Sequence, residues 1–330
     1  MHAWLCETLD GPSSLQWREL PTPEPGPDEV VIAVQAASLN FPDLLIVQGK
    51  YQFRPELPFA PGAEFAGVVQ AVGSAVAHLS PGMPVAALAG TGGFATHARV
   101  KALQAMPLPP GFALRDAAAF AFTYGTAHHA LVDRGALRSG ETVLVLGAAG
   151  GVGTAAIQVA KASGATVIAA ASTDAKCELC RQLGADHAIN YSSGDLREAV
   201  KALTQGRGVD VVFDPVGGAY AEPAFRSIAW RGRYLVIGFA NGAIPALPWN
   251  LPLLKGASIV GVFWGDFVRR EPEANMRMLG ALAAMYGRGE VKPAIEEILP
   301  LSRLRDAYDR LERRQILGKL VLVPDALLHS

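Results

Sequence analysis

The amino-acid sequence predicts an α/β protein in which a β-rich domain comes first and a doubly wound parallel sheet follows. The first observation behind this prediction is that strand-like and helical segments alternate from Thr123 onward, as in repeated βαβ units. The second is the run Thr142–Leu146, which is short, β-branched and apolar, as a buried parallel strand is. The third is the glycine-rich turn that follows this run at once and leads into an apolar helix.

The first 122 residues carry strand signals that turn signals separate. Val30–Ala36 and Phe65–Val72 are apolar runs of strand length. Proline and glycine cluster around them, at Pro21–Pro27 and at Pro58–Gly62. We therefore expect residues 1–122 to form a domain of strands and turns.

From Thr123 onward, strand-like and helical segments alternate along the sequence. We expect strands at 142–147, 165–171, 209–213, 233–238 and 257–263. Proline stands in the first turn of Pro272–Gly287 and glycine at its end, which predicts a helix over this segment. Leu301–Arg314 is predicted as another helix, and Lys319–Val323 as a final strand.

The glycine-rich turn has the chemistry of a dinucleotide-binding loop. Gly150 allows the backbone to approach a pyrophosphate, and Gly153 allows the helix to pack tightly on the strand. Ala148 stands where the first glycine of G-x-G-x-x-G usually lies, and a glycine-rich turn can also be purely structural. The free N–H groups and the positive dipole end of the helix nevertheless favour phosphate. We predict that the cofactor contacts Ala149, Gly150, Gly151, Val152 and Gly153.

The end of the second predicted strand, Ala165–Ala171, indicates which nicotinamide cofactor is bound. An NAD-binding protein usually has Asp or Glu here, which accepts a hydrogen bond from the ribose 2′-hydroxyl. This chain has Ser172 and Thr173, and Lys176 follows, so hydroxyls and a cation suit the 2′-phosphate of NADPH. Asp174 argues mildly against this. The simpler interpretation is that Ser172 caps the next helix and Lys176 is solvated.

Composition excludes several classes of function. The chain has 29 Lys and Arg against 30 Asp and Glu, so no strong field attracts nucleic acid or an anionic membrane. No apolar run reaches the length of a spanning helix, and the first residues do not resemble a signal peptide. Three cysteines do not make a disulfide framework. We therefore expect a cytoplasmic protein that binds neither nucleic acid nor membranes.

Eight motifs in order along the chain carry a resemblance to a known family. They are Asn40–Asp43, Gln48–Tyr51, Pro61–Gly67, Thr123–Thr126, Ala148–Gly153, Leu183–Tyr191, Asp214–Gly218 and Gly238–Gly242. Over nearly its full length the chain resembles the medium-chain dehydrogenase/reductase superfamily, and within it the zinc-free quinone oxidoreductase branch of ζ-crystallin-like enzymes. The resemblance implies a GroES-like catalytic domain at residues 1–122, completed by residues 268–330. It also implies a Rossmann NADP-binding domain at residues 123–267.

The resemblance also bears on metal binding. Zinc alcohol dehydrogenases of this superfamily carry Cys-x-x-Asp and Gly-His-Glu motifs, where this chain has Asn40-x-x-Asp43 and Gly62–Glu64. The thiolate and the imidazole are replaced, and one carboxylate cannot hold zinc alone. Cys177 and Cys180 have Cys-x-x-Cys spacing but no second ligand pair in the sequence, so we interpret them as small helix residues. We expect no metal.

Without a metal to activate an alcohol, the easier reaction is hydride donation from NADPH to a reactive electrophile. Quinones and α,β-unsaturated carbonyls fit, because hydrogen bonds can stabilise their delocalised product anions. The predicted catalytic residues are Asn40, whose amide could donate to a substrate carbonyl, and Tyr51, whose phenol could donate a proton. The simpler interpretations are a turn-stabilising Asn and an aromatic wall of the pocket.

The resemblance assigns further cofactor contacts at the nicotinamide end. Thr126 resembles the family threonine that hydrogen-bonds this end, although a hydroxyl at a helix N-terminus is the simpler interpretation. Phe239 and Ala240 follow a predicted strand, so they should lie by the nicotinamide at the carboxyl ends of the strands.

At the adenosine end, Lys176, Tyr191 and Arg314 resemble the cluster that surrounds the 2′-phosphate. Tyr191 would lie near the adenine, and Arg314 would reach over from the C-terminal segment. Arg313 is adjacent and is the alternative to Arg314.

The sequence leaves three functions open. The first is an NADPH-dependent quinone reductase, and its rival reduces C=C bonds of enones or 2-enoyl thioesters. Arg269 and Arg270 could form part of a basic rim for an acyl-CoA tail, or simply a solvated turn. The third is a low-turnover NADPH-binding structural or partner protein, since one fold hosts several functions. We also expect a homodimer through the apolar strand near residues 257–264.

Overall fold

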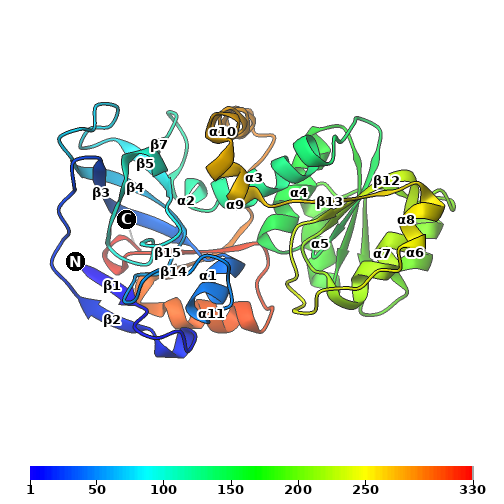
Figure 1. Cartoon of the computed structure of the whole chain (residues 1–330), viewed down its shortest axis with the longest axis horizontal. Helices are drawn as coiled ribbons and strands as arrows, with labels where there is room; N and C mark the ends of the chain where they lie inside the picture. The colour runs from blue at the N-terminus through cyan, green and yellow to red at the C-terminus, as the bar shows by residue number, and fades with distance from the viewer. Residues whose placement is uncertain (329–330) are drawn as a thin grey trace. The chain divides into compact units, whose positions relative to one another are not determined.

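The computed structural model describes residues 1–328 and divides the chain into two compact units. The first unit is Met1–Phe122 together with the C-terminal segment that begins at Ile295, and the second is Thr123–Ala294. Figure 1 colours the first unit blue to cyan and orange to red, and the second unit green to orange. The predicted α/β class, with a GroES-like β-rich domain and a doubly wound Rossmann domain, is confirmed.

The boundary at Thr123 coincides with the expected one, but the chain returns to the first unit at Ile295 and not at residue 268. The reason is that the helices before Ile295 pack within the second unit. The Trp264 ring fits against Gly125, where an added Cβ would lie 2.5 Å from it. The indole N–H of Trp264 also donates to Asn275 Oδ1 over 3.3 Å.

The first unit is built on a seven-stranded sheet in the order β14-β15-β3-β4-β5-β7, with β6 also paired to β3. Its strands are β3 (Glu29–Ser38), β4 (Glu64–Val72), β5 (Pro84–Leu88), β6 (His97–Lys101), β7 (Ala105–Pro107), β14 (Ile295–Pro300) and β15 (Lys319–Val323). A separate hairpin pairs β1 (His2–Leu5) with β2 (Gln16–Glu19). The helices are α1 (Phe41–Val47), α2 (Leu114–Ala117) and α11 (Leu304–Glu312).

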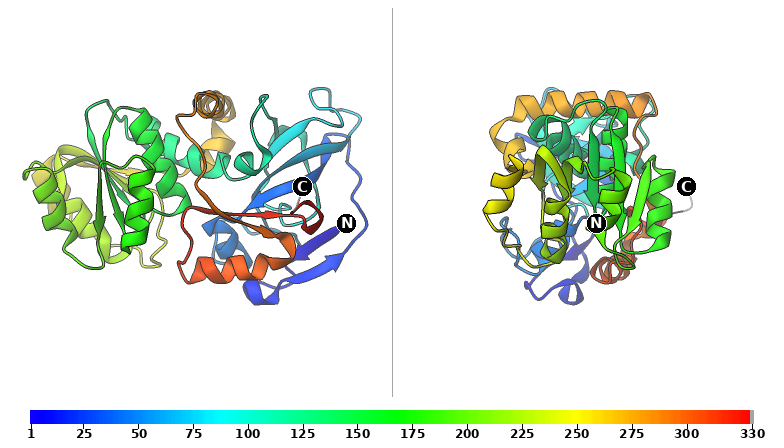
Figure 2. Two further views of the ribbon diagram at one scale, coloured as in Figure 1. Left: turned by 180° about the vertical axis from the view of Figure 1, so that it is seen from behind. Right: turned by 90° about the vertical axis from the view of Figure 1, so that its right-hand side faces the viewer.

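The C-terminal strand completes this sheet. β15 runs antiparallel to β3, with Val321 opposite Ser38 and Leu322 opposite Ala37. Figure 2 shows β15, coloured red, beside β3, coloured blue. Buried side chains from both ends of the chain, among them Ile32, Phe65 and Tyr308, share one core. The first 122 residues therefore need the C-terminal segment to close their own sheet.

The second unit contains a six-stranded, all-parallel sheet in the order β10-β9-β8-β11-β12-β13. The strands are β8 (Thr142–Leu146), β9 (Thr166–Ala171), β10 (His187–Asn190), β11 (Val209–Asp214), β12 (Ile228–Val236) and β13 (Ser258–Gly261). Numbered along this unit, the order is 3-2-1-4-5-6, which is that of the dinucleotide-binding Rossmann fold. The strand order reverses between β8 and β11, and ligands bind at such a switch point.

Helices cover both faces of this sheet, with α4 on one face and α6 and α7 on the other (Figure 1). The helices of this unit are α3 (Ala121–His128, which begins just before the boundary), α4 (Gly151–Ala162), α5 (Asp174–Gln182), α6 (Leu196–Leu203), α7 (Ala221–Arg226), α8 (Asn250–Lys255), α9 (Trp264–Arg270) and α10 (Pro272–Gly287). α10 has the predicted bounds. The predicted helix Leu301–Arg314 divides into a 3₁₀ turn at Leu301–Arg303 and α11.

Three strands differ from the sequence prediction. β10 (His187–Asn190) was not among the predicted strands, because its four residues include two polar ones and show no clear periodicity. β12 begins five residues early, at Ile228, where its pairing with β11 shifts register. β13 has only four residues and forms the edge of the sheet. Within residues 1–328, no helix has both the length and the apolar character to cross a membrane.

Candidate functional site

The glycine-rich turn lies where β8 ends at the switch point of the second unit. Gly147 has a φ of +58°, which glycine adopts without strain. Gly150 is the N-cap of α4 and is exposed, so the backbone there is open to a ligand. An added Cβ at Gly153 would lie 2.4 Å from the Gly147 carbonyl oxygen, so this close approach needs glycine.

The start of α4 can hold phosphate. The backbone N–H groups of Gly151, Val152 and Gly153 belong to the first turn, where a helix provides no carbonyl acceptors for them. Together with the positive end of the helix dipole, they favour a negatively charged group. Ala149 is buried beneath this turn. The arrangement fits a pyrophosphate.

The end of β9 carries the hydroxyls and the cation that the sequence predicted for a 2′-phosphate. Thr173, and not Ser172, caps α5, because its Oγ1 accepts from the Lys176 N–H over 3.3 Å. Ser172 Oγ instead lies 3.3 Å from Lys176 Nζ. Asp174 accepts from the Asn190 side chain over 2.8 Å, so its carboxylate is tied to the neighbouring strand. The Ser172–Lys176 pair can therefore present a hydroxyl and an ammonium to one anion.

Tyr191 follows β10, and its backbone N–H donates to the Ala171 carbonyl over 3.0 Å. Its ring lies against Tyr220, with centroids 4.4 Å apart and a tilt of 47°. These two half-buried aromatic rings, joined by the Tyr191 backbone to the end of β9, can form a wall for an adenine.

Phe239 and Ala240 follow β12 on the same edge of the sheet. Phe239 is exposed, and the Ala240 N–H donates to the Pro215 carbonyl over 3.0 Å. Thr126 lies on α3 and is buried. The predicted cofactor residues of the second unit, apart from Thr126, therefore all lie at the carboxyl ends of its parallel strands, as the fold requires of a ligand site.

The first unit contains a fully buried polar cluster around Asn40, which is 5% exposed. Lys319 Nζ donates to Asn40 Oδ1 over 2.6 Å and to the Leu39 carbonyl over 2.9 Å. The Asn40 amide donates to Glu64 Oε2 over 3.2 Å, and Ser38 Oγ donates to the same oxygen over 2.9 Å. The Asn40 side chain is thus held from both ends. Its amide nitrogen also lies 3.5 Å from Ser38 Oγ, so donation to a substrate would have to replace this longer contact.

Asp43 completes this cluster. Its two oxygens accept from the backbone N–H groups of Asn40 over 2.8 Å and of Ala63 over 2.9 Å. Burial raises the pKa of Asp43 to about 7, although those two hydrogen bonds favour the ionised form. Burial also raises the pKa of Glu64, against the pull of Lys319, and lowers the pKa of Lys319 itself.

Zinc does not fit this cluster. The ammonium of Lys319, 2.6 Å from Asn40 Oδ1, already places a cation beside the positions where zinc enzymes carry ligands. Asn40 and Ala63 offer neither a thiolate nor an imidazole. Among residues 1–328, no three His, Cys, Asp or Glu side chains are grouped closely enough to hold a metal ion.

Tyr51 follows α1 in the first unit and packs on its hydrophobic core. Burial, and secondarily the charge of Asp43, raise the pKa of the Tyr51 phenol. The phenol therefore keeps its proton at neutral pH and can donate a hydrogen bond. Arg314 also lies in the first unit, two residues after the end of α11, with a φ of +56°.

Sequence reasoning did not identify two groups. One is Lys319, which was assigned only to a strand; a lone lysine opening an otherwise apolar run was the available signal. The other is the pair Asp214 and Tyr234, whose phenol donates to the carboxylate over 2.5 Å. Asp214 stood in a motif that carried the family resemblance, but no role was assigned to it.

Comparison with known proteins agrees with both halves of the architecture. A family described as "Alcohol dehydrogenase GroES-like domain" matches residues 26–110, and one described as "Zinc-binding dehydrogenase" matches residues 151–281. "Quinone oxidoreductase-like protein 2" of Bos taurus is 41% identical over 322 residues, which cover 97% of this chain and 91% of that protein.

Two solved structures extend the comparison. A probable oxidoreductase from Mycobacterium abscessus is 38% identical with a TM-score of 0.89, over 98% of this chain and 99% of that one. The quinone oxidoreductase of Escherichia coli, solved in complex with NADPH, is 29% identical with a TM-score of 0.91. It covers 98% of this chain and is itself covered in full, at 100%.

Proposed function

The chain belongs to the zinc-free quinone oxidoreductase branch of the medium-chain dehydrogenase/reductase superfamily, and we propose that it transfers hydride from NADPH to a quinone without a metal. The observation that supports this most is the glycine-rich turn at the switch point, next to the Ser172–Lys176 pair. A pyrophosphate and a 2′-phosphate would find donors there at the same edge of one sheet.

NADPH, when bound, supplies two electrons and one hydrogen as hydride. A quinone that receives hydride becomes a hydroquinone anion, which then takes one proton from solvent or from a side chain. Hydrogen-bond donors that stabilise the developing oxyanion lower the barrier. We propose Asn40 and Tyr51 for this role, Asn40 through its amide and Tyr51 through its phenol.

For the cofactor, we propose that residues 149–153 hold the pyrophosphate and that Ser172, Thr173 and Lys176 hold the 2′-phosphate. Tyr191 and Arg314 would flank the adenosine end, and Thr126, Phe239 and Ala240 the nicotinamide end. Replacing Lys176 with Ala should weaken NADPH binding by about tenfold and leave NADH binding nearly unchanged, because only NADPH carries the 2′-phosphate. Parallel fluorescence titrations with both cofactors measure this.

The test of the activity follows NADPH oxidation with 1,4-benzoquinone as the acceptor. Turnover that persists after dialysis against a chelator supports the proposal. If the chain does not bind NADPH, or loses its activity when zinc is removed, the proposal is wrong.

The protonated phenol of Tyr51 supports a second candidate function, the reduction of C=C bonds. Because its pKa is raised, the Tyr51 phenol is protonated at neutral pH and could deliver the proton that an enolate needs. Arg269 and Arg270, the candidates for a basic rim around an acyl-CoA tail, both pair with Asp266. This carboxylate offsets part of the positive charge that would attract the tail. Comparing crotonyl-CoA with 1,4-benzoquinone separates the two candidates. If Tyr51→Phe abolishes only enoyl reduction, Tyr51 is the proton donor; if both activities survive, Tyr51 is structural.

A chain that binds NADPH but consumes none with any of a broad panel of electrophiles would instead be the low-turnover structural or partner protein. We propose that this chain is located in the cytoplasm. Cys6, Cys177 and Cys180 are free and buried, as is usual for proteins of a reducing compartment.

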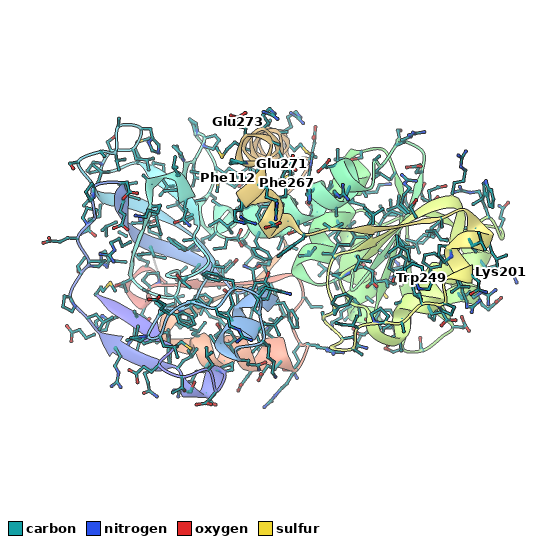
Figure 3. The ribbon with its side chains drawn as sticks, viewed as in Figure 1. Phe112, Lys201, Trp249, Phe267, Glu271 and Glu273 are labelled. Carbon is teal, nitrogen blue, oxygen red and sulfur yellow. The ribbon has the colours of Figure 1, made fainter. Side chains whose placement is uncertain are left out.

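We also propose a homodimer through the β13 edge of the second unit. Large apolar side chains are exposed near this edge: Trp230 is 71%, Leu253 78% and Trp249 83% exposed. Figure 3 labels Trp249 near α8. Trp230 and α8 meet at Gly256, where an added Cβ would lie 3.4 Å from the indole. An unpaired strand edge beside such a surface favours association, and light scattering at micromolar concentration tests it.

A further inference from the structure

The loop after β11 is the common neighbour of the candidate cofactor residues in the second unit. It begins at Asp214, the last residue of β11, and continues through Pro215–Gly218 to Tyr220. β11 lies next to β8 at the switch point, so this loop stands beside the glycine-rich turn. An added Cβ at Gly147 would lie 2.8 Å from Val216 Cγ2, which shows how closely the two loops pack.

The same loop also contacts the two other parts of the site. The Pro215 and Val216 carbonyls accept from the N–H groups of Ala240 over 3.0 Å and of Asn241 over 2.9 Å. At its far end, Tyr220 lies against Tyr191, the candidate adenine neighbour. One loop therefore links the candidate pyrophosphate, nicotinamide and adenine residues.

The loop has a conformation that most sequences would not adopt. Gly217 and Gly218 have φ values of +65° and +60°. An added Cβ at Gly217 would lie 2.9 Å from the Phe239 ring, and one at Gly218 would lie 2.4 Å from the Asn241 amide. Glycine adopts these φ values without strain, so the loop can pass this close to Phe239 and Asn241 only with glycine at both positions.

The Asp214 carboxylate holds the loop in this conformation. The side chain is 3% exposed, and its Oδ1 accepts from the backbone N–H groups of Val216 over 2.7 Å and of Gly217 over 2.8 Å. Its other oxygen, Oδ2, accepts from the phenol of Tyr234 over 2.5 Å. Tyr234 is itself buried in β12, against Phe225, so it anchors the carboxylate to a rigid strand.

We propose that Asp214 and Tyr234 are a positioning pair that fixes the loop 214–220 and thereby the shape of the NADPH site. The inference rests on the proposed function for the identity of the cofactor. Neither side chain needs to touch the cofactor: the carboxylate orients two loop N–H groups, and the phenol orients the carboxylate. Coupling through packed residues of this kind typically changes an affinity by a few-fold to about thirtyfold.

The test compares Tyr234→Phe with Phe225→Leu. Tyr234→Phe removes one hydroxyl and leaves the ring in place, so Asp214 loses its anchor. Phe225→Leu perturbs the same buried core without changing a hydrogen bond. We expect Tyr234→Phe to weaken NADPH binding about tenfold, and Phe225→Leu to change it less than about twofold at a similar loss of thermal stability.

A second measurement needs no cofactor. Hydrogen exchange at the Val216 and Gly217 amides should become faster in Tyr234→Phe and remain unchanged in Phe225→Leu. If Tyr234→Phe does not fold, Asp214→Asn takes its place. Its amide oxygen still accepts from the loop, while its amide N–H can only donate to the phenol oxygen, which reverses and weakens the bond to Tyr234. We expect an intermediate loss of affinity and of amide protection from it.

The proposal is overturned if Tyr234→Phe, or Asp214→Asn in its place, binds NADPH like the wild type. It is also overturned if Phe225→Leu weakens binding as much, since the effect would then be general packing. A wild-type chain that fails to bind NADPH overturns the proposed function instead, and the amide exchange still reports on the pair.

Discussion

The two units bury carboxylates in different ways. In the first unit, Glu64 and Asp43 lie near a buried cation, Lys319, which reaches them from the far end of the chain. In the second unit, Asp214 is satisfied by neutral donors alone, two backbone N–H groups and the Tyr234 phenol. The first arrangement is a matter of charge balance between distant segments, and the second is a matter of local geometry.

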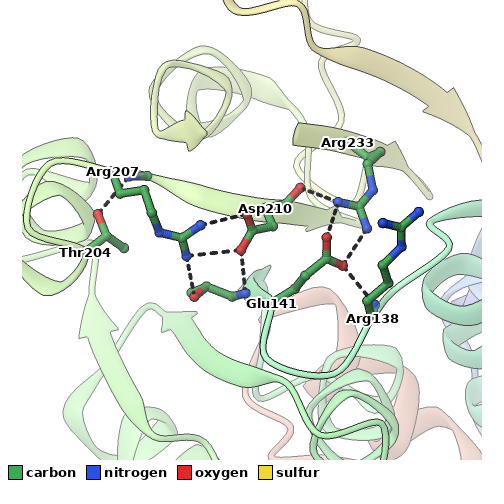
Figure 4. Close-up of polar contacts among 8 residues, drawn as sticks. Arg138, Glu141, Thr204, Arg207, Asp210 and Arg233 are labelled. Atoms are coloured by element: carbon green, nitrogen blue, oxygen red, sulfur yellow. Dashed lines mark hydrogen bonds and ion pairs between the residues drawn. The ribbon is translucent and has the colours of Figure 1, made fainter. Parts of the chain in front are cut away.

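A third group of charged residues, in the second unit, is only partly buried. Near the amino ends of β8 and β11, Arg233 of β12 forms two hydrogen bonds with Glu141, of 2.8 and 2.7 Å (Figure 4). Asp210 accepts from Arg207 and from the Thr142 N–H in the same network. The side chains of Arg233 and Glu141 are 20% and 21% exposed, so water can still reach them. These three groups predict that removing a charged or hydrogen-bonding partner destabilises the fold more where the remaining side chain is more deeply buried, because water can replace the partner only where it has access.

The largest effect should come from the buried cation. Lys319→Met leaves Glu64 and Asp43 buried without their cation, which should lower the free energy of unfolding by about 3–5 kcal/mol. Hydrogen exchange of β3 and β15 in urea measures this for the first unit alone, because two units need not unfold together.

The exposed Lys201, which pairs with Glu198 over 3.5 Å, provides the control; Lys201→Met should change stability by less than about 0.5 kcal/mol. Adding Glu64→Gln to Lys319→Met should recover part of the loss. If Lys319→Met costs no more than Lys201→Met, the cluster is not held by charge balance.

The next effect is on pH dependence. Because burial raises the pKa of Asp43 to about 7, folded chains keep a proton that unfolded chains release near pH 4. Its contribution to stability is therefore present below about pH 4 and is lost as pH rises through about 7, by at most about 1.4 kcal/mol per pH unit. Burial of Glu64 acts in the same direction. Asp43→Asn should flatten this slope, measured by urea unfolding at several pH values.

Asp28 serves as the control for this slope. Its hydrogen bond with Lys101 lowers its pKa, so its contribution appears above the unfolded pKa and disappears only as pH falls further. Asp28→Asn should therefore leave the slope between about pH 5 and about pH 7 unchanged, because even the lower limit lies about one unit above the usual Asp pKa. An Asp43→Asn variant with the wild-type slope would contradict the assignment.

The smallest effects should come from arginine–glutamate pairs of decreasing burial. Arg233→Leu removes two charge-assisted hydrogen bonds from the partly accessible Glu141, at an expected cost of about 1–2 kcal/mol. Arg226→Leu breaks a more exposed pair with Glu222, with side chains 39% and 43% exposed, and should cost about 0.5 kcal/mol. Thermal unfolding measures both, and equal costs would show that burial does not set the order.

Much of the second unit follows from local sequence. Thr142–Leu146 and Pro272–Gly287 were predicted with the bounds that the structure shows, or within a residue of them, because apolar runs, proline and glycine act over a few residues. The candidate cofactor residues from Gly150 to Lys176 also lie directly after strands that the local pattern predicts, and their role stays a proposal. β10 and the return of the chain at Ile295 did not follow, because packing against neighbours decides them.

The sequence by itself determined the Rossmann sheet, its glycine-rich turn and the hydroxyl–lysine pair at the end of β9, since each depends on residues close together in the chain. Only the tertiary structure decided that Lys319 would hold Asn40, a residue 279 positions away, and that Tyr234 would anchor the loop after Asp214. The physical reason is that a buried charge or acceptor must find its partner wherever the folded chain brings one, and no local pattern records which segment that will be.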